Sequence, residues 1–304
     1  MTKFKEILFL KNLNRVGKAA IYGKYWKLLT EAKNLDDLIS KILTFESKFS
    51  KEYLQETKQK VEELSEIIIN SDINVITVFD ENYPKKLEIM GNKRPLILYI
   101  KGDVNVLTKE NIALIGTRKP SEISQEFEEK LVKNIVNTLD RVVVSGLALG
   151  CDRIAHQATV DENKTTVAIL PSGVNVITPA SNKKLAERIL ETGGCLISEY
   201  EPNSKAFKRS YVERDQIVAA FSDATFVVEC GVKSGTMHTV NAAKEFNRQI
   251  FAYLPDEITN SFDGNKFILD NNFNAIKVDS ITKFLEDLDN INNSNMNSIQ
   301  QTLI

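Results

Sequence analysis

The stretch that decides the fold is Val142-Val143-Val144-Ser145-Gly146-Leu147-Ala148-Leu149-Gly150-Cys151-Asp152-Arg153-Ile154-Ala155-His156, where an apolar run passes through a glycine-containing loop into a helix-like segment. A strand that is apolar throughout, as Val142–Val144 is, is typical of a parallel sheet covered on both faces. Gly146 and Gly150 allow the backbone to bend and to approach a ligand closely. The following helix offers free N–H groups, which attract anions. Asp152 would repel an anion if it faced that site, so we expect it to cap the helix or to orient the loop.

The same order of strand, small or glycine-containing loop and helix recurs along the chain. The apolar runs are Asn111–Ile115, Arg141–Val144, Thr165–Leu170, Cys195–Ile197 and Ala224–Val228. The loops that follow them are Gly116-Thr117-Arg118, residues 145–150, Pro171-Ser172-Gly173, Ser198-Glu199-Tyr200 and residues 231–236. In a parallel sheet these loops line one edge, where ligands bind. We therefore predict a doubly wound, mostly parallel α/β sheet, closed by Ile250–Leu254, with a phosphate- or nucleotide-binding site at its carboxyl edge.

Spacing and composition divide the chain into four parts. Residues 1–72 are expected to form a small helical N-terminal domain. Its glycine turn in Asn14–Ile21 resembles a helix–hairpin–helix or SAM-like element, and an ordinary helical turn explains it equally well. Residues 73–256 are expected to form the main domain, with residues 73–109 as a lead-in that packs on it. Residues 257–289 are expected to be a C-terminal appendage, and residues 290–304, rich in Asn, Ser and Gln, a disordered tail.

Composition limits the classes of function. The chain has 304 residues, of which 42% are hydrophobic and 26% charged, as is typical of a globular protein. Because the formal net charge is −2, any nucleic-acid site must be a local cationic patch in a cleft. No apolar run approaches the roughly 18 residues of a membrane helix, and the start lacks signal-peptide architecture. We therefore expect a cytoplasmic protein that does not engage a membrane.

The cysteines and histidines do not suggest a metal site. Cys151, Cys195 and Cys230 form no Cys-x-x-Cys pair, and the two histidines are His156 and His238. We therefore predict no bound metal and buried free thiols.

From Asn82 to about Val278 a series of short motifs carries a resemblance to a known protein family. The pieces that carry the resemblance are, in order, Tyr83-Pro84, Leu98-Tyr99-Ile100-Lys101-Gly102, Ile115-Gly116-Thr117-Arg118, Ser145-Gly146-Leu147-Ala148 with Ala155-His156, Pro179-Ala180-Ser181-Asn182-Lys183-Lys184-Leu185, Gly193 with Ile197-Ser198-Glu199-Tyr200, Arg214 with Ile217 and Ser222, Val228-Glu229, Ser234-Gly235-Thr236 with Thr239 and Ala242, and Gly264-Asn265. Each piece alone is a weak signal, but in this order and spacing the pieces resemble the DprA/Smf family of DNA-processing proteins, and the chain is identified as a member. It is a divergent one, because Arg214-Asp215-Gln216 stands where the family usually has Arg-Asn-Arg.

The resemblance implies a Rossmann-like domain that binds single-stranded DNA, forms a homodimer and helps to load the RecA recombinase in natural transformation or recombination. The sequence contains no recognisable nucleophile–base pair and no Walker A pattern, so we expect no catalytic residue and no cofactor. The residues expected to contact DNA or phosphate are Gly116, Thr117, Arg118, Ser145, Gly146, Leu147, Ala148, Gly150, Asn182, Lys183, Arg214, Lys233, Ser234, Gly235 and Thr236.

The roles of three side chains have alternatives. Arg118 contacts a phosphate, or pairs with Glu199 or Glu229. Arg214 contacts DNA, or holds the loops by ion pairing. Tyr211 packs in the core more readily than it stacks on a base.

Two other functions fit the same loops. Gly235-Thr236 resembles the glycine-rich signature of the lysine-decarboxylase-like nucleotide phosphoribohydrolases, although the catalytic Glu that follows in those enzymes is missing here. A small-nucleotide sensor, for example in phage defence, would use the same crevice, and Gln216 in place of a second Arg fits a changed ligand.

Overall fold

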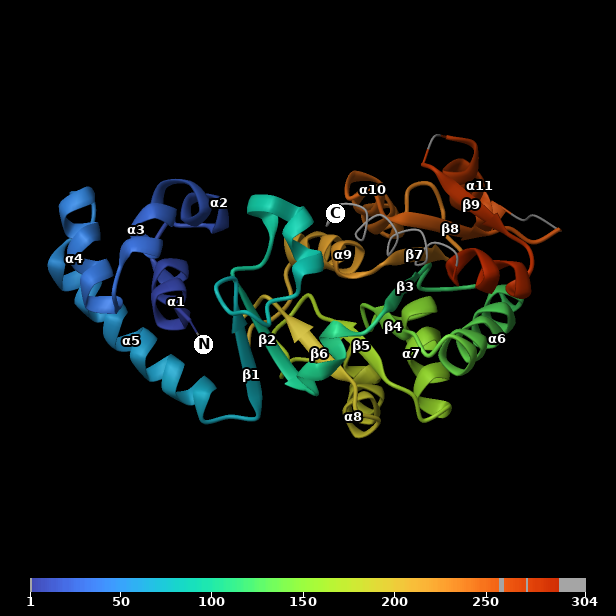
Figure 1. Ribbon diagram of the computed structural model, residues 1–304, viewed down its shortest axis with the longest axis horizontal. Coiled ribbons are helices and arrows are strands. Elements are labelled where there is room, and N and C mark those ends of the chain that lie inside the picture. Colours follow the sequence, from blue (N-terminus) through green and yellow to red (C-terminus); the bar gives the residue numbers. More distant parts are fainter. Residues whose placement is uncertain (1, 257–259, 272, 290–304) are drawn as a thin grey trace, which may run out of the picture.

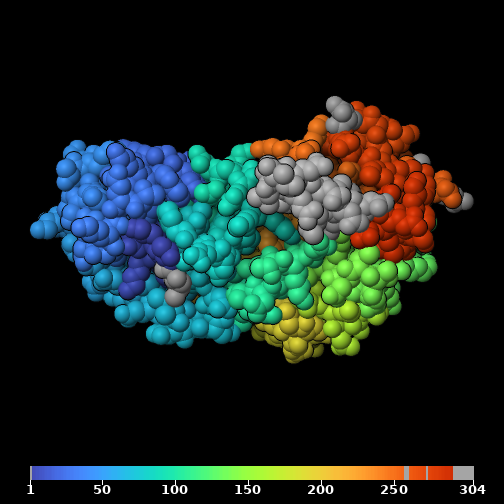
Figure 2. Space-filling view, in the orientation of Figure 1, coloured from blue at the N-terminus to red at the C-terminus, as the bar shows by residue number. Residues whose placement is uncertain are grey.

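A nine-stranded sheet with helices on both faces makes up the larger part of the computed structural model, and the N-terminal helices lie at one end of the molecule (Figure 1). The structure describes residues 2–256, 260–271 and 273–289. Residues 73–109 lie between the N-terminal helices and the remaining sheet (Figure 2). The predicted disordered tail, residues 290–304, lies outside the described residues. None of the described helices combines the length and the apolar character needed to cross a bilayer.

The parallel strands are those that the sequence predicts. They are β3 (Asn111–Ile115), β4 (Val142–Ser145), β5 (Thr166–Ile169), β6 (Cys195–Ser198) and β7 (Ala224–Val227). Two further parallel strands follow, β8 (Gln249–Tyr253) and β9 (Ala275–Val278). The prediction that Ile250–Leu254 closes the sheet is therefore wrong. β9 was not predicted because it is an edge strand that is only partly buried. Its sequence includes Lys277 and so lacks a continuous apolar run.

The strand order is β1-β2-β6-β5-β4-β3-β7-β8-β9. From β3 the chain winds outward through β4, β5 and β6, and then returns to the other side of β3 to form β7, β8 and β9. The order reverses between β3 and β7, whose register pairs Leu114 with Phe226. The predicted doubly wound sheet is confirmed, and this reversal is the point at which such sheets bind ligands.

The lead-in segment contributes strands to the sheet. β1 (Ile73–Thr77) and β2 (Ile97–Gly102) form an antiparallel pair, and β2 pairs antiparallel with β6. The 3₁₀ segments η2 (Lys85–Lys93) and η3 (Val104–Thr108) flank β2. Residues 73–109 thus extend the sheet at the edge that faces the N-terminal helices.

Helices cover the two faces of the sheet in two groups. One face carries α6 (Glu122–Thr138), α7 (Cys151–Asp161) and α8 (Lys183–Glu191), and the other carries α9 (Lys208–Phe221) and α10 (Thr236–Glu245) (Figure 1). Alternate residues of each strand point to opposite faces. In β3, Ile112 and Leu114 pack with the α6 side, whereas Ala113 and Ile115 pack with the α9 and α10 side. Burial of apolar surface on both faces stabilises the sheet.

The N-terminal helices pack on β1, β2 and neighbouring loops through one apolar cluster. They are α1 (Phe4–Asn12), α2 (Lys18–Ala20), η1 (Ile21–Tyr25), α3 (Trp26–Glu31), α4 (Leu35–Phe45) and α5 (Lys51–Ile69). The predicted glycine turn lies between α1 and α2. Two cations fix these helices to the end of β6: Lys11 Nζ donates to the Glu199 carbonyl oxygen at 3.0 Å, and Lys18 Nζ lies 2.5 Å from the Glu199 carboxylate.

The segment after β8 returns to the sheet. It contains η5 (Asn260–Phe262), α11 (Asp263–Asp270), β9 and a helix over residues 281–289. All three cysteines of the chain are buried and free, as predicted.

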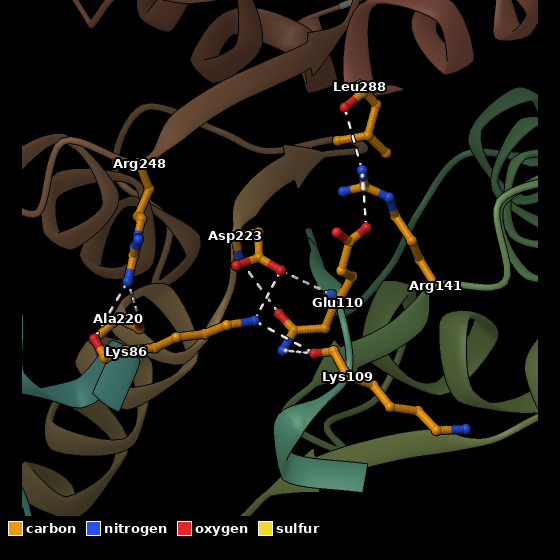
Figure 3. Close-up of polar contacts among 9 residues, drawn as sticks. Lys86, Lys109, Glu110, Arg141, Ala220, Asp223, Arg248 and Leu288 are labelled. Atoms are coloured by element: carbon orange, nitrogen blue, oxygen red, sulfur yellow. Dashed lines mark hydrogen bonds and ion pairs between the residues drawn. The ribbon is translucent and has the colours of Figure 1, made fainter. Parts of the chain in front are cut away.

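A polar network ties the amino edge of the sheet together (Figure 3). The Asp223 carboxylate accepts hydrogen bonds from Lys86 Nζ at 2.8 Å and from the Asn111 backbone N–H at 2.9 Å. Nearby, Arg248 donates to the Ala220 carbonyl oxygen at 2.7 Å, and the buried Arg141 donates to the Leu288 carbonyl oxygen at 3.3 Å. These contacts join η2 and β3 to the residue before β7, α9 to the residue before β8, and the residue before β4 to residues 281–289. The side chains of this edge thus serve the fold.

Candidate functional site

A crevice of about 650 Å³ opens at the carboxyl edge of the sheet, beside the reversal between β3 and β7. The loops after β3, β4 and β7 and one face of α9 form its walls. The lining residues are Ile115, Gly116, Thr117, Arg118, Gly146, Ala148, Asp152, Lys208, Tyr211, Val212, Arg214, Asp215, Val218, Ser234, Gly235, Thr236, His238 and Thr239. Three cations stand against two carboxylates in this set, so the local charge is positive although that of the whole chain is not.

The first loop, Gly116-Thr117-Arg118, is joined to the β7 loop on the other side of the reversal. The Thr117 N–H donates to the Glu229 carbonyl oxygen at 2.7 Å, and the Thr236 hydroxyl donates to the Gly116 carbonyl oxygen at 3.0 Å. These bonds hold the two loops side by side at the crevice.

The Arg118 side chain is exposed, and its guanidinium lies 5.9 Å from the centre of the Tyr211 ring. The two carboxylates proposed as its partners are engaged elsewhere. Glu229 accepts hydrogen bonds from the Ser121 N–H at 2.9 Å and hydroxyl at 2.6 Å, and Glu199 pairs with Lys18. Within the described ranges Arg118 forms no ion pair, so its charge faces the crevice.

In the second loop, residues 145–150, Asp152 orients the backbone. Its carboxylate accepts hydrogen bonds from the N–H groups of Gly146 at 3.1 Å and Ala148 at 3.2 Å. The prediction that Asp152 orients the loop is confirmed. It follows that these two amides already have an acceptor, and that the loop presents a shaped wall to the crevice.

Three predicted contact residues, two in this loop and one beside it, are buried. Ser145 donates its hydroxyl hydrogen to the Leu114 carbonyl oxygen at 2.7 Å. The Asn182 side-chain amide donates to the carbonyl oxygens of Leu147 at 2.9 Å and Ala148 at 3.1 Å. Ser145, Leu147 and Asn182 are fully buried, so in this conformation they hold the loop and do not line the crevice.

Arg214 lies directly beneath the second loop. Only 6% of it is exposed, and its Nη1 donates to the Ile169 carbonyl oxygen at 3.3 Å. The guanidinium also lies 3.8 Å from the Asp152 carboxylate and 3.0 Å from that of Asp215. A Cβ at Gly146 would overlap it, which explains the glycine. Of the two roles expected for Arg214, the structure shows the ion pairing that holds the loops. The Arg214 side chain also lines the crevice.

The third loop, residues 231–236, leads into the N-terminus of α10. Ser234, Gly235 and Thr236 line the crevice, and the exposed Lys233 lies next to them but outside the lining. Neither the Gly235 nor the Thr236 N–H donates a hydrogen bond to any described residue. Unpaired amides at a helix N-terminus attract an anion. The last two predicted residues, Gly150 and Lys183, do not line the crevice. Gly150 lies against the backbone of Thr117 and Arg118 in the first loop, and Lys183 is exposed on α8.

One face of α9 forms the wall opposite these loops. Lys208, Tyr211, Val212, Asp215 and Val218 follow helical spacing and all line the crevice. The preference for Tyr211 as a core residue is therefore wrong, because its ring is only partly buried and lies at the crevice. Sequence reasoning assigned no site role to Asp215, Val218 or His238. The spacing of residues 208, 211, 215 and 218 is a signal that could have found the α9 face.

Burial raises the pKa of Asp215 to about 6, although Arg214 opposes the shift. The folded protein then keeps this proton at pH values where the unfolded chain, with the ordinary pKa of 3.8, has lost it. We expect the free energy of unfolding to fall, relative to that of Asp215→Asn, as pH rises from about 4 to about 6. Urea denaturation of both proteins at several pH values measures this difference. A difference that stays constant over this range would contradict the assignment.

The described residues contain no group of three or more His, Cys, Asp or Glu side chains arranged to hold a metal ion. What the crevice offers a ligand is hydrogen-bond donors, two cationic side chains at its rim and a partly aromatic wall.

Comparison with known proteins identifies the family. The sequence profile of the family described as DNA recombination-mediator protein A matches residues 74–289. Protein Smf of Borreliella burgdorferi is 30% identical over 246 residues, which cover 79% of this chain and 74% of that protein. DNA processing protein DprA of Streptococcus pneumoniae is 31% identical over 182 residues, which cover 60% of this chain and 63% of that protein. The chain thus matches less than two thirds of the Streptococcus protein.

Solved structures share the fold. The crystal structure of DprA from Streptococcus pneumoniae matches 94% of this chain and 98% of that chain, with a TM-score of 0.76 and 24% identity. The structure of DNA processing protein A from Helicobacter pylori, which is described by its single-stranded DNA binding mode, matches 72% of this chain and 96% of that chain, with a TM-score of 0.65 and 28% identity. Because the family profile spans more than half of the sequence, this chain belongs to the DNA recombination-mediator protein A family, the DprA/Smf proteins.

Proposed function

We propose that this protein binds single-stranded DNA along the crevice at the carboxyl edge of its sheet and acts in DNA processing without being an enzyme. The observation that carries the proposal is the meeting of exposed cations and unpaired helix amides at one opening. Arg118 and Lys208 are exposed at its rim, and the unpaired Gly235 and Thr236 amides lie at the start of α10 in the crevice lining. Phosphate oxygens are the natural acceptors for this set of donors.

The aromatic wall supports a nucleic acid over inorganic phosphate as the ligand. Tyr211 lies at the crevice with the Arg118 guanidinium over its ring, 5.9 Å from the ring centre. A base can stack on the tyrosine face while its phosphate is held by the arginine. Stacking of this kind is tolerant of sequence, as is expected of a protein that processes DNA generally.

The enzymatic alternative has less support. The two carboxylates that could replace the missing catalytic Glu are Glu199 and Glu229. Glu199 pairs with Lys18, Glu229 accepts hydrogen bonds from Ser121, and neither lines the crevice. For either of these two carboxylates to act in hydrolysis, it would have to lie at the substrate.

Family membership also suggests a cellular role. We propose that the protein works in the cytoplasm as a homodimer, and that it delivers single-stranded DNA to the RecA recombinase in natural transformation or recombination. The relatives named as DNA processing proteins support this role.

Fluorescence anisotropy with a labelled single-stranded oligonucleotide tests DNA binding. We expect Arg118→Ala to weaken binding about 10- to 100-fold near physiological salt, because a charged contact to phosphate contributes roughly 1.5 to 3 kcal/mol. Affinity of the unchanged protein should also fall steeply with salt. Lys283→Ala, a change of an exposed lysine far from the crevice in sequence, is the charge control and should retain binding. No binding by the unchanged protein at low salt would contradict the proposal.

A further inference from the structure

The crevice has an exposed rim and a buried floor. Arg118 and Lys208 at the rim are exposed, whereas Ile115, Val218 and Thr239 are 5%, 2% and 4% exposed. Ile115 and Val218 give this floor apolar surface on which a base can pack. A strand bound along the rim could therefore place a base toward the floor.

The Asp215 carboxylate in this inner region has capacity left to accept hydrogen bonds. At Asp152, one oxygen, Oδ2, accepts hydrogen bonds from two loop amides and lies 3.8 Å from Arg214 Nη1. Asp215 lies on the inward face of α9, and one of its oxygens, Oδ1, is 3.0 Å from Arg214 Nε. No described residue donates a hydrogen bond to the other oxygen. A carboxylate repels phosphate, so the part of a nucleotide that can face Asp215 is a hydrogen-bond donor on the base.

The nucleobases differ in the donors they offer a carboxylate. Guanine presents two adjacent donors, N1–H and the N2 amino group, that match both carboxylate oxygens. Thymine offers a single ring N–H on the same edge, and cytosine and adenine offer a single amino group. Tyr211 lies one helical turn before Asp215, on the same face of α9. A base stacked on the Tyr211 ring can thus turn its edge toward Asp215.

We propose that Tyr211 and Asp215 form a base-recognition pair that prefers guanine within single-stranded DNA. This inference rests on the proposed function and adds a base preference to it. Arg118 and Lys208 hold the flanking phosphates, Tyr211 stacks on the base, and Asp215 accepts the two guanine donors. Asp215 then serves as a specificity residue, in a crevice whose phosphate contacts are otherwise independent of sequence.

Anisotropy titrations with three 12-nucleotide probes test the preference: all thymine, the same strand with one central guanine, and the same strand with hypoxanthine at that position. Hypoxanthine keeps the ring N–H of guanine and lacks its amino group. We expect the guanine probe to bind about 5- to 100-fold more tightly than the thymine probe, as for a good bidentate contact, with hypoxanthine in between. In Asp215→Asn the guanine preference should disappear, because the amide that replaces the carboxylate cannot accept both guanine donors. Glu187→Gln, which removes one charge from the exposed side of α8, should keep the preference.

The outcomes separate this inference from the function on which it rests. Equal affinity of the unchanged protein for all three probes would overturn the base preference and leave DNA binding intact. A guanine preference that persists in Asp215→Asn would overturn the role of Asp215. Failure of the unchanged protein to bind any probe would overturn the proposed function, and the inference with it. The comparison of probes on the unchanged protein does not depend on whether a variant folds.

Discussion

Gly150→Ala is expected to lower the free energy of unfolding by about 3 to 5 kcal/mol, the sum of backbone strain and overpacking. Gly150 has φ of 74° and ψ of −128°, a conformation that residues with a side chain rarely adopt. A Cβ at this position would also overlap the Thr117 carbonyl oxygen and the Arg118 backbone. These are main-chain atoms of the first loop, so they cannot move aside without displacing the crevice wall. Urea denaturation measures the effect, and DNA affinity should fall with it.

Gly235→Ala is the matched control, since Gly235 also lies in the crevice. Its φ is −59°, and a Cβ there would meet nothing within 4 Å. The stability should change by less than about 1 kcal/mol, because alanine adopts this conformation readily. Similar losses in the two variants would contradict the structural account of Gly150.

Arg214→Met should destabilise the protein by about 3 to 5 kcal/mol near neutral pH, the usual cost of removing one partner of a buried ion pair. Methionine keeps most of the side-chain volume and removes the charge. Asp152 and Asp215 would then remain in the crevice without their shared cation. DNA affinity should fall more than in Arg118→Ala, because the crevice would lose the charge and the shape of its second loop. Thermal denaturation and anisotropy measure both effects.

Arg209→Met provides the comparison for Arg214. Arg209 lies on the same helix, its side chain is 82% exposed, and it forms an ion pair with Glu213 one turn along. An exposed pair of this kind contributes at most about 1 kcal/mol. If Arg214→Met were as mild as Arg209→Met, Arg214 would not be the organising residue of the crevice.

The sequence predicted the part of the fold that local pattern determines. Buried parallel strands such as Val142–Val144 are continuous apolar runs, and the loops after them are marked by glycine, so both could be located without a structure. β9 was missed, because a partly buried edge strand has no such run. The pairing of β2 with β6 was also missed, since the position of an antiparallel strand at the sheet edge depends on tertiary contacts and not on its own residues.

The candidate site was also predicted only in part: its loops were located from the sequence, and the α9 face was not. The loops at Gly116–Arg118, Gly146–Ala148 and Ser234–Thr236 meet at the crevice, as expected for strand ends of one sheet. What the pattern could not predict is which side of α9 faces them. That orientation depends on how α9 packs against the sheet and α10, and it places Tyr211 and Asp215 at the site. Nor could it predict that Ser145 and Asn182 are used to hold the second loop.

Amide hydrogen exchange with and without a saturating single-stranded oligonucleotide tests the central claim most directly. Peptides that cover residues 116–119 and 231–238 should exchange more slowly in the complex, because the Gly235 and Thr236 amides gain phosphate acceptors. Peptides at the amino edge, around Lys109 and Asp223, should exchange at unchanged rates. Protection at the amino edge, with none at the start of α10, would contradict binding in the crevice.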